Sequence, residues 1–169
     1  AQQLPIWRVN AQDEIVRRGK NARANLIKAI ESGTLTRGQQ TWCIWALGRI
    51  DRGTGEYRRI LAHALGERQP GNLNLRIQAV RILGENRVTA ARSELIGLLD
   101  DPEPRIRLAA IQSLQKTGFG DRSAAVISAL ADETDRCTFY TGWQVLRRQL
   151  PTDTRRSLLA HERPGARLM

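Results

Sequence analysis

The sequence predicts an all-α protein, a right-handed α-solenoid of about five two-helix repeats. Apolar residues recur with the 3.6-residue period of a helix, and one pattern returns every 31–36 residues along the 169-residue chain. Aromatic residues make up only 5%, which disfavours a β-sandwich or barrel. No apolar run reaches the length of a membrane helix, and no signal peptide is apparent.

Five segments carry an apolar anchor with a small residue four positions before it. The anchors are Ile15, Leu47, Leu83, Leu114 and Leu146, and the small residues are Ala11, Cys43, Ala79, Ala110 and Gly142. A small side chain at one fixed helical position lets a neighbouring helix approach closely. We therefore expect these segments to be the first helices of five stacked units.

Five further amphipathic stretches lie between the anchors and supply the second helices, at residues 22–31, 55–65, 89–99, 121–131 and 152–161. Glycine, proline, asparagine and serine gather at their boundaries, as expected of turns. The predicted repeats cover residues 5–32, 38–66, 73–100, 103–132 and 135–163, in one domain over residues 1–169. Residue 1 is Ala rather than Met, so we expect the chain to be a piece of a larger bacterial protein.

The run from Leu98 to Leu114 combines Leu-Leu, an acidic pair, two prolines, Arg107 and Ala-Ala. It resembles a HEAT repeat of the short phycobilisome-lyase (PBS lyase) type. The resemblance covers nearly the whole chain and is strongest over residues 39–131. It implies a structural Asp and Arg that help link neighbouring repeats. These residues map onto Asp101 (or Asp100) and Arg107, with Arg76 and Arg8 in the equivalent place.

A weaker resemblance rests on Trp7-Arg8, Trp45–Arg49 and Thr141–Gln144. These segments are similar to the HEAT segment of large bacterial proteins that join a membrane-bound dehydrogenase-like propeller to a haem-binding cytochrome domain. The resemblance implies a helical spacer in the periplasm or cell envelope; otherwise a cytoplasmic location is expected. The haem attachment pattern Cys-x-x-Cys-His is absent, so no cofactor is expected.

The charge is strongly positive, with 27 basic against 17 acidic residues and a net charge of +10. Arginines recur in the first turns of the predicted second helices, where a cation opposes the helix macrodipole. They are Arg23, Arg58, Arg59, Arg92, Arg122 and Arg155. We call this set the arginine column. The column either lines a groove for an acidic partner, or each member pairs with a loop acid such as Glu56, Asp121 or Asp153, or faces solvent.

Residues suited to catalysis are scarce. His63 and His161 lie far apart in the sequence, and a metal site needs three or four converging ligands. His161-Glu162 is similar to one His-Glu pair of HEAT-like deoxyhypusine hydroxylase, an enzyme that needs several such pairs. Cys43 and Cys137 lie three repeats apart, too far for a disulfide. We expect no catalytic residues, no metal and no cofactor.

These observations favour a non-catalytic scaffold or protein-interaction module, monomeric and not inserted in a membrane. Its partner is a protein or a neighbouring domain of the same chain. Binding of nucleic acid or another polyanion along a basic concave face is the alternative, although exposed aromatics interleaved with basic residues are not expected. An enzyme of the bilin-lyase type is a further alternative that rests on repeat similarity alone.

Overall fold

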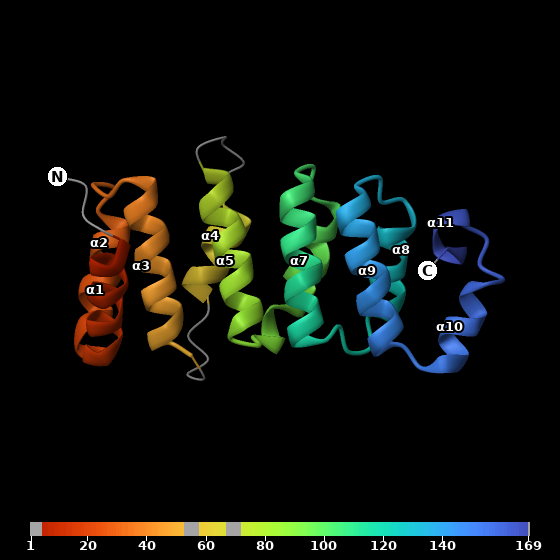
Figure 1. Cartoon of the computed structure of the whole chain (residues 1–169), viewed down its shortest axis with the longest axis horizontal. Coiled ribbons are helices and arrows are strands. Elements are labelled where there is room, and N and C mark those ends of the chain that lie inside the picture. The colour runs from red at the N-terminus through yellow and green to blue at the C-terminus, as the bar shows by residue number, and fades with distance from the viewer. Residues whose placement is uncertain (1–4, 53–57, 67–71, 169) are drawn as a thin grey trace. The chain divides into compact units, whose positions relative to one another are not determined.

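The computed structural model describes residues 5–52, 58–66 and 72–168, and every regular element in these ranges is a helix (Figure 1). The predicted all-α solenoid class is therefore confirmed. Backbone contacts divide the chain into two compact units, Ala1–Asn86 and Arg87–Met169. The division falls inside the predicted third repeat, and one domain over residues 1–169 stays a prediction.

In the residues that the structure describes, the first unit contains five helices, which are the two helices of each of the first two predicted repeats and the first helix of the third. They are α1 (Pro5–Arg18), α2 (Lys20–Glu31), α3 (Arg37–Ile50), α4 (Arg58–Leu65) and α5 (Leu73–Glu85). In Figure 1, α1, α3 and α5 follow one another, and α1 packs on α3 and α3 on α5. Of the second helices, α2 packs against both α1 and α3, and α4 packs against α5.

A close approach of α3 and α5 holds the centre of the first unit. Leu47 and Leu83, two of the predicted anchors, are both buried. A side chain at Gly48 would collide with the buried Ile82, so the two helices approach at a glycine. The Asn86 amide then donates to the Gly48 carbonyl at 2.7 Å, which ties the end of α5 to α3.

The second unit begins with the 3-10 helix η2 (Thr89–Ala91), α6 (Arg92–Gly97) and the 3-10 helix η3 (Leu98–Asp100). It continues with α7 (Pro104–Thr117), α8 (Ser123–Ala131), α9 (Arg136–Gln149), α10 (Thr152–Leu158) and α11 (Pro164–Arg167). The first helices α7 and α9 pack on each other. The helix α6 packs on α7, and α8 packs on both α9 and α11.

Two of the expected second helices differ from the prediction. The stretch 89–99 forms α6 flanked by two 3-10 turns instead of one helix, since tighter turns are common where a short helix begins and ends. The stretch 152–161 is helical only to Leu158, and the chain then forms the short α11, which was not predicted.

Side-chain caps set the starts of three first helices. Thr36 forms a capping box with Gln39 before α3. Glu103 accepts from the backbone N–H of Arg105 before α7, which has proline in its first turn as predicted. Asp135 accepts from the backbone N–H of Thr138 at 2.8 Å before α9. These caps satisfy backbone N–H groups of the first turn and fix the residue at which each helix begins.

Candidate binding surfaces

The arginine column starts in the first unit with Arg23, Arg58 and Arg59. The Arg23 guanidinium donates to both carboxylate oxygens of Asp51, at 2.6 and 3.3 Å, and the Asp51 side chain is buried. Arg59 forms an ion pair with Glu31, and Arg58 is exposed. Two of these three guanidinium groups therefore already bond to carboxylates of the chain.

The second unit holds the other three members of the column. Arg92 donates from Nε and Nη2 to the Thr117 carbonyl, at 3.0 and 2.5 Å, and from Nε to the Gly118 carbonyl at 3.1 Å. Arg122 is exposed at the N-cap of α8. Arg155 donates to the Thr152 hydroxyl at 2.9 Å. The column thus contains both engaged and exposed arginines.

Three of the bonded arginines share one arrangement, which explains why a cation stands at the start of their helices. Arg23, Arg59 and Arg92 lie near the starts of α2, α4 and α6 and reach the end of another helix. Their partners are the C-cap Asp51 of α3, the last residue Glu31 of α2 and the last residue Thr117 of α7. A cation at a helix C-terminus is favourable, so the cost at one macrodipole is offset at another.

A second network surrounds Arg107, the arginine assigned to a structural role from the resemblance. Its guanidinium donates to both oxygens of Glu133 at 2.7 Å, and the Glu133 side chain is only 3% exposed. It also donates to the carbonyls of Asp101 and Pro102, at 2.9 and 3.2 Å. The buried Asp101 carboxylate accepts from the Glu103 backbone N–H at 3.0 Å. Arg107 therefore joins the start of α7 to the loop that precedes α9.

The resemblance implied the same structural role for Arg76 and Arg8. Arg76 is buried in α5, as a structural residue would be. The Arg8 side chain lies outside the described residues. Sequence reasoning missed Glu133, the partner of Arg107. Glu133 follows Asp101 by 32 positions, which is one repeat length, so its equivalent position in the next repeat could have identified it.

The polar groups suited to catalysis are dispersed over the described residues. Over residues 5–52, 58–66 and 72–168, no three His, Cys, Asp or Glu side chains lie close enough to hold a metal ion. Burial lowers the pKa of His63 and raises that of the Cys43 thiol. His161 Nδ1 accepts from the Arg163 backbone N–H at 3.1 Å, and both cysteines are free.

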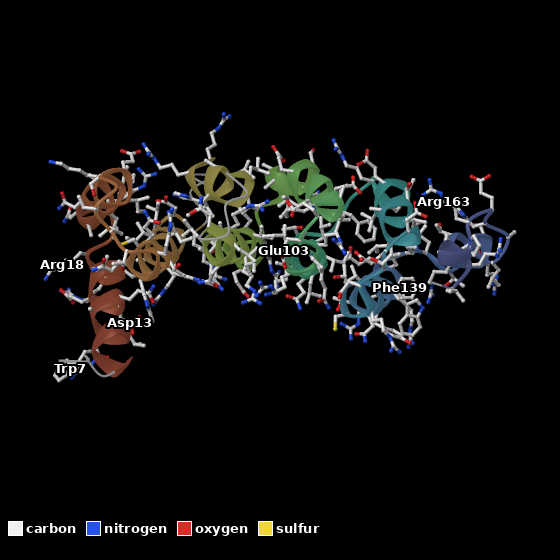
Figure 2. The ribbon with its side chains drawn as sticks, turned by 90° about the horizontal axis from the view of Figure 1, so that it is seen from above. Trp7, Asp13, Arg18, Glu103, Phe139 and Arg163 are labelled. Carbon is white, nitrogen blue, oxygen red and sulfur yellow. The ribbon has the colours of Figure 1, made fainter. Side chains whose placement is uncertain are left out.

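An open groove of about 630 Å³ lies between α1, α2 and α3 in the first unit. Trp7 and Trp42 line it, with Ile15, Leu26 and Cys43. Trp7 is 62% exposed and lies near the N-terminal end of α1 (Figure 2). Trp42 is 38% exposed, whereas Trp45 is half-buried and donates to Gln78 at 3.2 Å.

The helix α9 carries a second aromatic surface. Tyr140 is 55% exposed, and its ring meets that of Phe139 edge to face, with centroids 6.0 Å apart. The Arg147 guanidinium lies over the Trp143 ring, 5.4 Å from its centroid. Tyr140 is the one aromatic residue of α9 that is exposed, and Phe139 and Trp143 are half-buried, so a single exposed ring lies among the exposed arginines of this helix. Periodicity shows which face of a helix is apolar but not how much of a large ring the neighbouring helices cover.

Of the residues that the structure describes, none belongs to a helix long and apolar enough to cross a membrane. Residues 68–138 match the family model of HEAT repeats. No curated protein and no solved structure matched the chain. The matched segment contains Arg76, Asp101 and Arg107, the residues that the resemblance identified as structural. The match therefore supports a HEAT-repeat module over residues 68–138 within an all-α solenoid.

Proposed function

We propose that the chain is a non-catalytic HEAT-repeat scaffold that binds a protein partner and belongs to a larger multidomain protein. The observation that carries this proposal is the exposure of large aromatic side chains on first helices: Trp7 on α1, Trp42 on α3 and Tyr140 on α9. Trp, Tyr and Arg dominate the binding energy of protein interfaces, and this chain holds all three at its surface. HEAT repeats typically act as interaction modules, in agreement with this function.

Two finer assignments belong to the same proposal. The first is that the repeats are HEAT repeats of the phycobilisome-lyase type. The second is that the chain is the spacer of a dehydrogenase–cytochrome protein, in which case the neighbouring domains are its partner. A bilin-lyase activity has no support from a site, because similarity of fold does not establish chemistry.

Nucleic-acid binding along the arginine column is the second candidate. Arg23, Arg59 and Arg92 bond to acceptors of the chain, and using them for phosphates would break these bonds. The column therefore offers a polyanion less free charge than the net charge of +10 suggests. This favours the protein-binding function.

Site-specific photo-crosslinking in the source cells tests the proposal. A benzophenone side chain is placed at Tyr140, at Trp42 and, as a control, at Ser93, an exposed residue of α6. We expect Tyr140 or Trp42 to crosslink to one protein that also forms a stoichiometric complex with the purified chain in calorimetry. The proposal is wrong if no crosslinked protein reconstitutes a complex, or if the purified chain turns over a substrate.

A further inference from the structure

The exposed face of α9 is basic and aromatic. The helix has no acidic residue from Arg136 to Gln149. Its exposed side chains include Arg136, Tyr140, Arg147 and Arg148, and Figure 2 labels Phe139 on this helix. Arginines in a last helical turn also stabilise the helix itself, which accounts for Arg147 and Arg148 but not for the aromatic rings beside them.

The arginines of this face have no acidic partner in the described part of the chain. None of Arg136, Arg147 and Arg148 forms an ion pair there. The acids that precede α9 are engaged elsewhere. Asp132 pairs with Arg163, Glu133 with Arg107, and Asp135 caps the helix. The positive charge of α9 is therefore available to an outside ligand, unlike that of Arg23, Arg59 and Arg92.

The contact of Arg147 with Trp143 prepares the guanidinium for binding. Stacking on the indole restricts the side chain and leaves the N–H fork of an exposed arginine open to acceptors. A carboxylate fits such a fork with two parallel hydrogen bonds. Because part of the side-chain entropy is already lost, less is lost on binding.

The aromatic rings of this face are partly covered by the chain. Arg147 covers one side of the Trp143 indole, and Phe139 meets Tyr140 at an interplanar angle of 75°. Binding of single-stranded nucleic acid relies on open ring faces on which successive bases stack. The arrangement therefore favours a ligand that brings carboxylates and apolar side chains. A hollow of about 290 Å³, lined by Trp143, Gln144, Arg147 and Arg148, lies beside these groups.

We propose that this α9 face, consisting of Tyr140, Trp143, Gln144, Arg147 and Arg148, is the docking surface for an acidic segment of a partner protein. The proposal rests on the protein-binding function proposed above. Carboxylates of the segment accept hydrogen bonds from Arg147 and Arg148, and an apolar side chain of the segment enters the hollow beside Trp143. Charge complementarity with a chain of net charge +10 assists the encounter.

Fluorescence anisotropy of a labelled peptide tests the docking surface. The probe is a fluorescein-labelled peptide of Glu, Asp and Leu, compared with its Gln, Asn and Leu counterpart and with a dT20 oligonucleotide. We expect Arg147→Glu to weaken binding of the acidic peptide at least about tenfold. The matched control Arg81→Glu makes the same charge change on the exposed side of α5 and should weaken it less than about threefold.

A conservative variant separates the stacked fork from simple charge. Arg147→Lys keeps the charge but loses the planar fork, and we expect a loss of about three- to fivefold. Circular dichroism checks that each variant stays folded. Equal losses for Arg147→Glu and Arg81→Glu would show that net charge alone attracts the peptide. Tighter binding of dT20, lost in Arg147→Glu, would assign the face to nucleic acid. Either result overturns the proposal.

The natural partner distinguishes failure of this inference from failure of the function. If the crosslinked partner forms its complex equally well with Arg147→Glu, the α9 face is not the docking surface and the protein-binding function stands. If no partner is found and the acidic peptide does not bind, both are wrong. If the complex with the partner weakens at least about tenfold only in Arg147→Glu, both are supported.

Discussion

At the scale of single residues, the ion pairs of this chain differ in how much solvent reaches them. The Arg107–Glu133 pair has side chains that are 14% and 3% exposed, whereas the Arg17–Glu14 pair has side chains that are 73% and 40% exposed. Buried carboxylates depend on their partners, because removing one leaves an uncompensated charge. Exposed pairs contribute little because water and salt screen them. Arg107 is therefore the arginine whose loss should most affect the second unit.

Burial alone would raise the pKa of Glu133, but hydrogen bonds from Arg107 and from the Asp135 backbone N–H lower it below the ordinary 4.5. A lowered pKa in the folded state stabilises the fold above the unfolded pKa, and this contribution is lost as the pH falls through the folded pKa. We expect Arg107→Gln to cost about 1.5–3 kcal/mol in urea unfolding at pH 7, since charged hydrogen bonds are lost. The difference from the parent should shrink below pH 4.5.

Arg17→Gln serves as the control, because the exposed pair with Glu14 should leave the free energy of unfolding nearly unchanged. A difference between Arg107→Gln and the parent that stayed constant from pH 7 to pH 3 would contradict the role assigned to Glu133. It would mean that packing of the arginine stem, not its charge, stabilises this corner.

At the scale of elements, the sequence predicts the helices, which local pattern determines, but not the side-chain partners, which depend on how the helices pack. The 3.6-residue period predicted all five first helices, and proline at the start of α7 was predicted as well. The partners of Arg23 and Arg92 lie 25–28 positions away in the sequence, so local spacing could not identify them. Acids nearer in sequence, such as Asp121 and Asp153, were the expected partners. Glu56, a further expected partner, lies outside the described residues.

The small-residue position predicted in each first helix has a direct counterpart where α8 meets α9. A side chain at Gly142 would collide with both methyl groups of Leu130, which is fully buried. Ala79 and Ala110, at the same position of α5 and α7, are also fully buried. Small side chains at this position therefore set how closely neighbouring helices pack.

Gly142→Ala should destabilise the chain although alanine favours helices. Helix propensity alone would stabilise by about 1 kcal/mol, whereas overpacking costs about 1–3 kcal/mol. We expect a net loss in thermal unfolding. The matched control is Gly97→Ala at the end of α6, where an added Cβ meets nothing within 4 Å, and it should be neutral or stabilising. Equal melting temperatures for the two variants would show that Leu130 makes room and that the contact is not limiting.

At the scale of the whole molecule, secondary structure and charge are the properties that measurements of the intact chain report. Circular dichroism should show a helical spectrum for the full chain, since all regular elements over residues 5–52, 58–66 and 72–168 are helices. Repeats of paired helices contain no strand. A strand content above about a tenth of the residues would contradict the solenoid assignment.

The net charge of +10 predicts some attraction to nucleic acid. Because three arginines of the column already bond to acceptors of the chain, we expect this attraction to be weak. If the column contacted four or five phosphates, the log–log dependence of affinity on salt would have a slope of about −3 to −4.5. We expect a slope shallower than about −2 for dT20 and binding that vanishes near physiological salt, because Arg23, Arg59 and Arg92 are engaged by the chain.

Arg92→Ala gives the sharpest version of this prediction. A phosphate-binding arginine would lower the salt slope by about one when removed and would leave stability unchanged. Arg92 instead donates to the carbonyls that end α7, so its loss should cost about 1–3 kcal/mol of stability with no change in slope. Arg122→Ala, at an exposed position, should change neither quantity appreciably. Sub-micromolar affinity for dT20 at about 0.15 M salt, lost in Arg92→Ala while stability is retained, would promote nucleic-acid binding over the protein-binding function.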